Sequence, residues 1–140
     1  MRQLGADERR ELATWVDHYK HWRDVVHHGV IRQGSHHGLT WLQAQSTDAS
    51  AALVALYRRT EEAARYTPPL CVPGLAPQRR YRAHALHLPS VPHSRASTPW
   101  IDALASGTLE LTGAQLHESG LPLPLLPPES AIVVGLRAIA

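Results

Sequence analysis

The stretch LTWLQAQSTDASAALVALYRR, residues 39–59, decides the fold of this 140-residue chain. Two runs that are typical of strands, residues 39–45 and 51–59, flank the polar turn Thr47-Asp48-Ala49-Ser50. Asp and Ser favour such turns because their side chains bond to nearby backbone groups. In the second run, apolar side chains fall on both faces of an extended chain, which indicates a central, covered strand. The stretch therefore predicts two strands joined by a short hairpin connection.

Four further runs of the same kind surround this hairpin, at residues 29–33, 81–88, 108–112 and 131–139. Each is short and is bounded by Gly, Pro, Ser or Asp. Residues 121–128 contain four prolines, so that segment must be extended and must lie outside the middle of a sheet. Six short strands with frequent turn signals predict a mainly β fold, an antiparallel β-sandwich with Greek-key connections.

One N-terminal α-helix precedes the predicted strands, over residues 7–28. Asp7 is placed to cap it, and Gly29 is placed to end it in a left-handed conformation. The apolar side chains recur at steps of three and four residues, which builds one stripe along a helix. They are Leu12, Trp15, Val16, Tyr19, Trp22, Val25 and Val26. A capping box over residues 112–115 predicts one further short helical turn, and no other helix is expected.

Length and composition predict one compact domain. The chain is 44% hydrophobic and 19% charged, which is ordinary for a folded protein. Its formal net charge is +2, and the basic residues, with Lys20 as the single lysine, are scattered among twelve acidic residues. Such scattering indicates a solvated surface, so nucleic-acid binding is not expected. No run of eighteen apolar residues occurs, so a membrane-spanning segment is not expected either.

The single cysteine and the N-terminal composition bear on location. Cys71 cannot form an internal disulfide, and its apolar neighbours Leu70 and Val72 indicate a buried, unreactive thiol. The first twenty residues are charged and lack the apolar run of a secretory signal. We therefore expect a cytoplasmic protein.

The residue patterns of common catalytic and metal sites do not occur in the sequence. The ten histidines lack the His-Glu-x-x-His spacing and the cysteine support of a zinc site. His84 and His87 would point to opposite faces of a strand. Neither a Gly-x-Ser-x-Gly elbow nor a glycine-rich phosphate loop is found. We accordingly assign no catalytic, cofactor-binding or metal-ligating residue, and we expect no cofactor.

The large aromatic side chains allow two interpretations. They fill the core of a β-sandwich, which is the role that we favour. They can also stack on sugar rings, so a stand-alone carbohydrate-binding or interaction module remains the alternative. A planar, solvent-facing pair of aromatic rings on one sheet face would indicate that module. The residues concerned are Trp41, Tyr57, Tyr66, Tyr81 and Trp100.

Three segments, taken in order, resemble the family 36 glycoside hydrolases. The helical residues 11–20, ELATWVDHYK, with Arg23 and the HGV at 28–30, are similar to the last helix of that family's catalytic barrel. PGLAP at 73–77, followed by Tyr81-Arg82, is similar to a turn into a late strand. The family's closing segment is matched by TGA at 112–114, Leu116, Gly120-Leu121, Leu123-Pro124 and PESA at 128–131. The resemblance covers nearly the whole chain.

The resemblance implies the non-catalytic C-terminal domain of an α-galactosidase, a glycosidase of carbohydrate metabolism. Such a hydrolase cleaves terminal α-galactosides such as melibiose and raffinose. Residues 1–28 would be the helix that ends the catalytic barrel, and residues 29–140 would be the C-terminal β-sandwich. The domain would brace the upstream barrel and help subunits to associate in oligomers.

The same resemblance implies that this chain is inactive alone. Retaining glycosidases need two carboxylates about 5–5.5 Å apart, and the family carries both on barrel strands upstream of these segments. Its Lys-Trp-Asp signature does not occur here, and no aspartate matches either catalytic motif: Asp7, Asp17, Asp24, Asp48 or Asp102. Without a barrel, the sandwich covers only part of the apolar helix. We therefore expect homo-oligomers that form through the N-terminal helix or a sheet edge.

Overall fold

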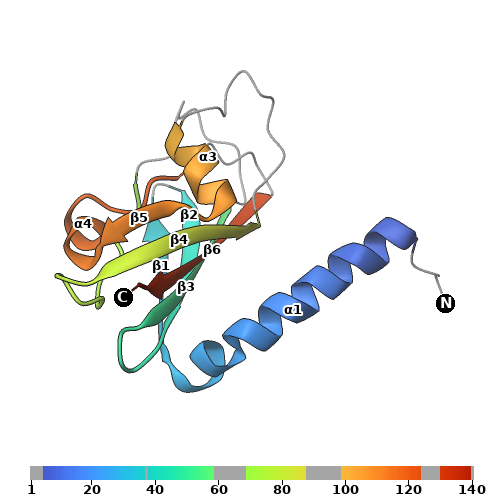
Figure 1. Ribbon diagram of the computed structural model, residues 1–140, viewed down its shortest axis with the longest axis horizontal. Helices are drawn as coiled ribbons and strands as arrows, with labels where there is room; N and C mark the ends of the chain where they lie inside the picture. Colours follow the sequence, from blue (N-terminus) through green and yellow to red (C-terminus); the bar gives the residue numbers. More distant parts are fainter. Residues whose placement is uncertain (1–4, 37, 59–68, 88–98, 124–129, 140) are drawn as a thin grey trace.

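The computed structural model describes residues 5–36, 38–58, 69–87, 99–123 and 130–139. A twisted sheet carries a long helix, α1, on one side, and α1 runs outward from the sheet toward the N-terminus (Figure 1). The elements in chain order are α1 (Ala6–His28), β1 (Val30–His36), β2 (Leu39–Gln45), β3 (Ala51–Arg58), β4 (Arg80–His87), α3 (Pro99–Ser106), β5 (Leu109–Thr112), α4 (Gly113–Glu118) and β6 (Ser130–Ala138). None of the helices within these ranges combines the length and the apolar content that a membrane crossing requires.

The six strands form one antiparallel sheet in the order β1-β2-β3-β6-β4-β5. The predicted hairpin is present, because β2 pairs with β3 from Gln45↔Ala52 to Leu39↔Arg58. As the composition of its run indicates, β3 lies inside the sheet, between β2 and β6. All six predicted strands are found, so the predicted class of a mainly antiparallel β fold behind one N-terminal helix is confirmed.

The main core lies on one face of this sheet, which we call the inner face. Alternate residues of the central strands point into it, as the two-residue period of a strand requires. The strands contribute Leu39, Ala52, Val54, Leu56, Tyr81, Ala83, Ile132, Val134 and Leu136. The layer that covers them consists of α3, α4 and extended segments, which contribute Leu70, Val72, Leu75, Leu104, Leu116, Leu121 and Leu123.

Prolines explain why this covering layer contains little strand structure in the described ranges. Pro69, Pro73 and Pro122 lie in or beside the extended segments and lack the backbone N–H that a ladder needs. One isolated bridge, Leu70↔Leu121, joins two of these segments. Two buried glutamines of β2 hold the extended segment that contains Pro73 and Gly74. Gln45 donates to the Gly74 carbonyl at 2.6 Å, and Gln43 donates to the Pro73 carbonyl at 3.3 Å.

Both predicted details at the ends of α1 are wrong. The N-cap is Gly5, without a side-chain cap, and Asp7 lies inside the first turn. Gly29 ends the helix in an extended conformation with φ −84°, and the chain passes straight into β1. Glycine is needed there for close approach, since a Cβ at position 29 would collide with the Gln45 and Val25 carbonyl oxygens.

Of the two smaller helices, α4 was predicted from the sequence and α3 was not. The capping box at the start of α4 is present in both directions, between Thr112 and Gln115. Helix α3 was not expected. It begins at Pro99, which suits a first helical turn, and it buries Leu104 against the core, but eight residues are too few to show a clear apolar period.

Candidate functional site

The face of the sheet opposite the core, which we call the outer face, carries α1 at one end. Trp22 and Val25 are 6% and 8% exposed and pack against Ala44 and Ala51. The indole of Trp22 lies directly on β6, where Gly135 leaves room for it, because a Cβ at that position would overlap the ring. A glycine inside a strand often marks such a close approach, and this signal in the sequence was missed.

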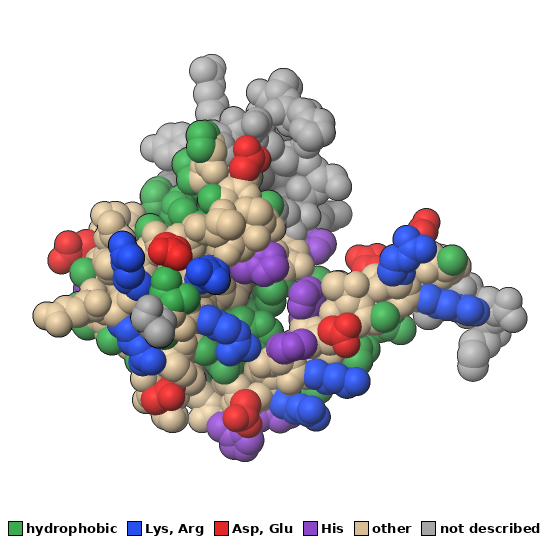
Figure 2. Space-filling view, in the orientation of Figure 1, with side chains coloured by type: hydrophobic (Ala, Val, Ile, Leu, Met, Phe, Trp, Pro, Cys, Tyr) green, Lys and Arg blue, Asp and Glu red, His purple; other side chains and the backbone are tan. Residues whose placement is uncertain are grey.

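The other apolar side chains of α1 remain in solvent, as the sequence led us to expect. Five of the seven predicted stripe residues are exposed: Leu12, Trp15, Val16, Tyr19 and Val26. Leu12, Val16 and Tyr19 follow steps of four and three residues, so they share one side of the helix. We call these three the second stripe. Figure 2 shows apolar surface along α1 beyond the point where the helix meets the sheet.

An apolar cavity of about 180 Å³ opens between α1 and the outer face. Trp15, Tyr19 and Val26 line its helix side. The outer face continues as apolar surface beyond it, because Leu42 and Tyr57 are 42% and 41% exposed. The helix and the sheet therefore present two apolar walls that meet at an angle and that no described segment covers.

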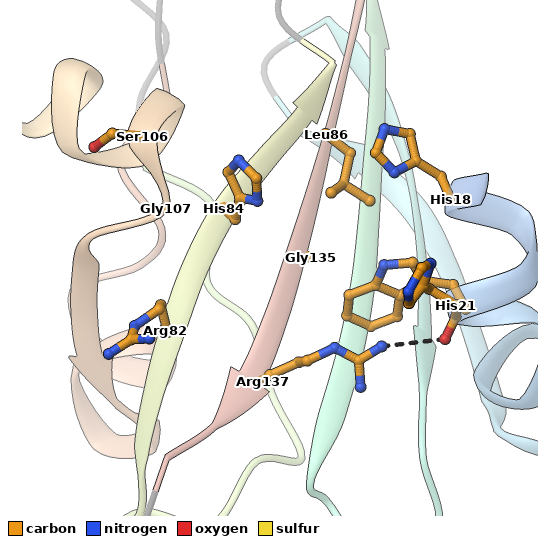
Figure 3. A pocket seen from close by; sticks show the side chains of 10 residues that line it. His18, His21, Arg82, His84, Leu86, Ser106, Gly107, Gly135 and Arg137 are labelled. Atoms are coloured by element: carbon orange, nitrogen blue, oxygen red, sulfur yellow. Dashed lines mark hydrogen bonds between the residues drawn. The ribbon is translucent and has the colours of Figure 1, made fainter. Parts of the chain in front are cut away.

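A second cavity, of about 360 Å³, lies between α1, β4, β6 and the end of α3, and we call it the basic cavity. Histidine and arginine side chains gather at this junction (Figure 2). Figure 3 shows Arg82 and His84 on one wall and His18 and His21 on the other, while Arg137 reaches across from β6 toward α1.

Arg137 ties the two walls together. Its guanidinium lies 4.2 Å above the centre of the Trp22 ring, and its Nη2 donates to the His21 carbonyl oxygen at 3.1 Å. A cation over an indole face is attractive, and the planar guanidinium fits such a stack. On the far side, Arg82 is paired with Glu110 of β5 at 3.3 Å.

A third, polar cavity of about 380 Å³ lies beside the β2–β3 turn. The Ser50 hydroxyl at 2.6 Å and the Ser46 hydroxyl at 2.8 Å donate to the Asp48 carboxylate, as does the Ser50 amide at 3.0 Å. These bonds hold the pKa of Asp48 at about 2, below its ordinary value of 3.8. These bonds shape the turn.

The aspartates occupy separate and exposed positions. Asp7, Asp17 and Asp24 lie on α1, Asp48 lies in the β2–β3 turn, and Asp102 lies on α3. Asp7 is 3.9 Å from Arg10 in an exposed ion pair, and the Nδ1 of His28 is within hydrogen-bond distance of the Asp24 carboxylate, at 3.2 Å.

The described histidines, cysteine and acidic residues form no group of three that could hold a metal ion. One prediction about the histidines is wrong. His84 pairs with Gly135 and His87 with Val133, so the two histidines lie on the same face of β4. The register shifts between Ala85 and His87, and this irregularity inserts the residue that reverses the expected alternation. His87 consequently reaches α1, with its ring 5.6 Å from that of Trp15.

The predicted burial of Cys71 is also wrong, since its side chain is exposed. Its neighbours Leu70 and Val72 are buried, at 5% and 1% exposure. In an extended segment alternate side chains face opposite ways, so two buried neighbours place the residue between them in solvent.

The aromatic residues do not form the arrangement that would indicate a sugar-binding module. Among the described strands, Tyr81 is fully buried, Trp41 packs half-buried against the core, and Tyr57 is exposed on the outer face. The Tyr81 hydroxyl donates to the Ala49 carbonyl at 2.6 Å, which is a structural role. Trp100 is half-buried on α3, and Tyr66 lies outside the described residues. No two aromatic rings face solvent on one face of the described sheet.

Comparison with known proteins shows sequence similarities that the geometry of the cavities does not reveal. Residues 39–136 match the glycosyl hydrolase family 36 C-terminal domain. An α-galactosidase of Escherichia coli is 33% identical over 130 residues, which cover 85% of this chain and 18% of that enzyme. The chain thus spans about a fifth of the length of this relative.

Solved structures share the fold. The α-galactosidase AgaB of Geobacillus stearothermophilus matches with a TM-score of 0.74 and 22% identity, over 98% of this chain and 16% of that one. The α-galactosidase of Lactobacillus brevis matches with a TM-score of 0.72 and 18% identity, over 99% of this chain and 17% of that one. In both, the matched region is a small part of a much longer chain.

Proposed function

This chain belongs to the family of glycosyl hydrolase family 36 C-terminal domains, and we propose that it braces the catalytic barrel of an α-galactosidase. The observation that carries the proposal is the second stripe. Leu12, Val16 and Tyr19 are 53%, 42% and 50% exposed on a helix that already packs on its own sheet through another side. Monomeric proteins seldom leave such connected apolar surface in water, so this surface is suited to a permanent partner.

The two apolar walls define the shape of that partner. The second stripe supplies one wall, and the outer face around Leu42 and Tyr57 supplies the other. Covering a half-exposed large side chain contributes about 1 kcal/mol or more, so several together would hold a neighbouring domain firmly. A barrel whose last helix is α1 would meet both walls at once.

We infer the corresponding division of the chain. Residues 1–28 act as the last helix of the barrel, and residues 29–140 act as the C-terminal domain. The family match begins at residue 39, within the strands, and the E. coli relative is named an α-galactosidase, which supports this assignment. The proposed activity of the complete enzyme is hydrolysis of terminal α-galactosides such as melibiose and raffinose, while the cytoplasm remains the predicted location.

A chimera tests the bracing role. This chain would replace the matched segment of the E. coli α-galactosidase, and activity would be measured with an aryl α-galactoside. We expect a soluble, active chimera and, for this chain alone, no hydrolysis above the buffer rate, because no aspartate of the sequence matches either catalytic motif of the family. Turnover by the chain alone would contradict the assignment.

Charged substitutions within the chimera separate bracing from simple tethering. Leu12→Asp with Val16→Asp places two charges in the proposed contact, and we expect loss of both thermal stability and activity. The matched control is Arg10→Asp with Thr14→Asp, two exposed polar positions on the side of the same helix opposite the second stripe. Equal losses in the two double variants would contradict the proposed contact.

A further inference from the structure

We propose that the basic cavity binds a single oxyanion, the phosphate or carboxylate group of a small molecule. Its volume of about 360 Å³ falls within the range of small-molecule sites. The inference does not rest on the proposed barrel contact. His21 follows Leu12 by nine residues, which at 3.6 residues per turn places it about 180° around the helix from the second stripe.

The charge of the lining favours an anion. Arg82, Arg137 and three histidines border the cavity, and the residues that line it include neither Asp nor Glu. Glu110, which does not line the cavity, forms an ion pair with Arg82, with 3.3 Å between Nη2 and Oε1. In the part of the chain that the structure describes, Arg137 has no carboxylate partner. Arg137 also borders the polar cavity, with Asp24 and Asp48, but neither of these carboxylates forms an ion pair with it.

Arg137 is also held in position before any ligand arrives. The stack on Trp22 at 4.2 Å and the hydrogen bond to the His21 carbonyl at 3.1 Å fix the plane of the guanidinium. That bond uses one of its five N–H donors, and a fixed planar fork matches the geometry of a phosphate or carboxylate. Little side-chain freedom remains to be lost on binding, which favours affinity.

The histidines face the cavity from both walls. The Nδ1 of His21 lies 2.8 Å from the Asp17 carbonyl oxygen, which can only accept, so Nδ1 carries the hydrogen, and Nε2 donates to an anion when the ring is protonated at both nitrogens. His84 stands on the opposite wall, on β4 (Figure 3). An anion between the walls would meet Arg137 and imidazoles on either side, and imidazole can carry a positive charge near neutral pH.

The same lining suits a neutral sugar less well than an anion. Sugar hydroxyls need acceptors as well as donors, and the lining contains no Asp, Glu, Asn or Gln, so its side-chain acceptors are the Ser106 hydroxyl and unprotonated imidazole nitrogens. The ring of Trp22, on which a sugar could stack, is covered by Arg137. An oxyanion is therefore the ligand class that the cavity fits, and it is distinct from the substrate of the proposed enzyme.

Nuclear magnetic resonance titration of the chain tests the proposal, with inorganic phosphate and acetate as probes and sodium chloride at matched ionic strength as the reference. We expect saturable shifts of the His21 and His84 imidazole signals and of the Trp22 indole signal, with a Kd of about 1 mM for the better probe. A stronger response to phosphate assigns a phosphate ligand, and a stronger response to acetate assigns a carboxylate. Galactose is expected to give no saturable shift at these signals.

Two variants and a charge-matched control complete the test. Arg137→Gln and His84→Gln are each expected to weaken binding, the first by about tenfold. The His84 variant leaves the stack of Arg137 on Trp22 in place, so it reports on binding without disturbing the helix anchor. Arg23→Gln removes the same charge as Arg137→Gln from an exposed site outside the cavity, and we expect a Kd within about twofold of the parent. The proposal is overturned if neither probe binds saturably, if Arg23→Gln weakens binding as much as Arg137→Gln, or if galactose binds at these signals.

Discussion

The two faces of the sheet differ in how completely this chain covers them. On the inner face, sixteen buried residues form one cluster that the chain builds entirely from its own segments. On the outer face, four buried residues hold the end of α1, and large apolar side chains beyond them remain in solvent. The inner face is complete as a core, whereas the outer face keeps large apolar side chains exposed among the described residues.

In the central strand β3, the difference does not come from the strand itself. Neighbouring residues such as Leu53 and Val54 are equally apolar but face opposite ways. Val54 is fully buried, whereas Leu53 is covered only in part, at the edge of the contact with α1. In β3, what covers each face therefore decides how much each side chain contributes to stability.

The largest expected effect comes from cutting a side chain out of the inner face. Leu56→Ala, at a residue 1% exposed, is expected to lower the free energy of unfolding by about 2–5 kcal/mol. Leu42→Ala, at a residue 42% exposed on the outer face, is expected to change it by less than about 0.5 kcal/mol. Urea unfolding measures both, and similar losses would contradict the contrast between the faces.

A smaller effect is expected where α1 meets the outer face. Gly135→Ala forces the Trp22 ring away from β6, which we expect to cost about 1–3 kcal/mol and to speed amide hydrogen exchange along α1. Gly5→Ala is the control, because a Cβ there has nothing within 4 Å. Unchanged exchange in α1 after Gly135→Ala would mean that Trp22 does not anchor the helix.

The exposed second stripe of α1 is expected to cause self-association. We expect this chain to form dimers at micromolar concentration, because the second stripe is uncovered. Leu12→Ser with Val16→Ser is expected to shift the population to monomer, as measured by size-exclusion chromatography with light scattering. Arg10→Ser with Asp17→Ser leaves the net charge unchanged, alters the opposite side of the helix and should leave the dimer intact. A monomeric parent chain would show that the surface is tolerated in water.

The smallest effect belongs to the turn between β2 and β3, which lies on neither face. Hydrogen bonds from Ser50 and Ser46 lower the pKa of Asp48 from 3.8 to about 2, so the ionised carboxylate stabilises the folded state. That contribution is complete above about pH 4 and is lost as pH falls through about 2. The difference in Tm between the parent chain and Asp48→Asn should therefore shrink between pH 5 and about pH 2. A constant difference across this range would contradict the role of the Asp48 charge.

Local patterns predicted much of the fold because they depend on near neighbours. The alternation in residues 39–59, the helical stripe of α1 and the capping box at Thr112 all appear where they were expected. The failures are of another kind. Gly29 and Gly135 are glycine because distant atoms approach them, and the two histidines of β4 share a face because of a register shift with β6. A glycine inside a strand signals a close approach, but the adjacent sequence does not show which distant atoms approach or where the register shifts.

The candidate site was harder to predict, because contacts distant in sequence create it. The stack of Arg137 on Trp22 joins residues 115 positions apart in the chain, and no motif marks either one. The basic cavity takes its residues from α1, β4, β6 and the end of α3. The histidines of α1 look like ordinary surface residues in the sequence, and they become part of a cavity only when the helix docks on the sheet.

The sequence by itself determined that six strands and one long amphipathic helix would form, since hydrophobic period and turn chemistry act over a few residues. It also determined that α1 carries more apolar side chains than one contact can cover. Only the tertiary structure decided which of them are covered. Trp22 and Val25 are buried because the last turns of α1 lie on the sheet, whereas its N-terminal turns run away from the sheet (Figure 1) and leave Leu12 and Val16 exposed. Burial depends on the position of the whole helix, and that position is set by contacts along the entire chain.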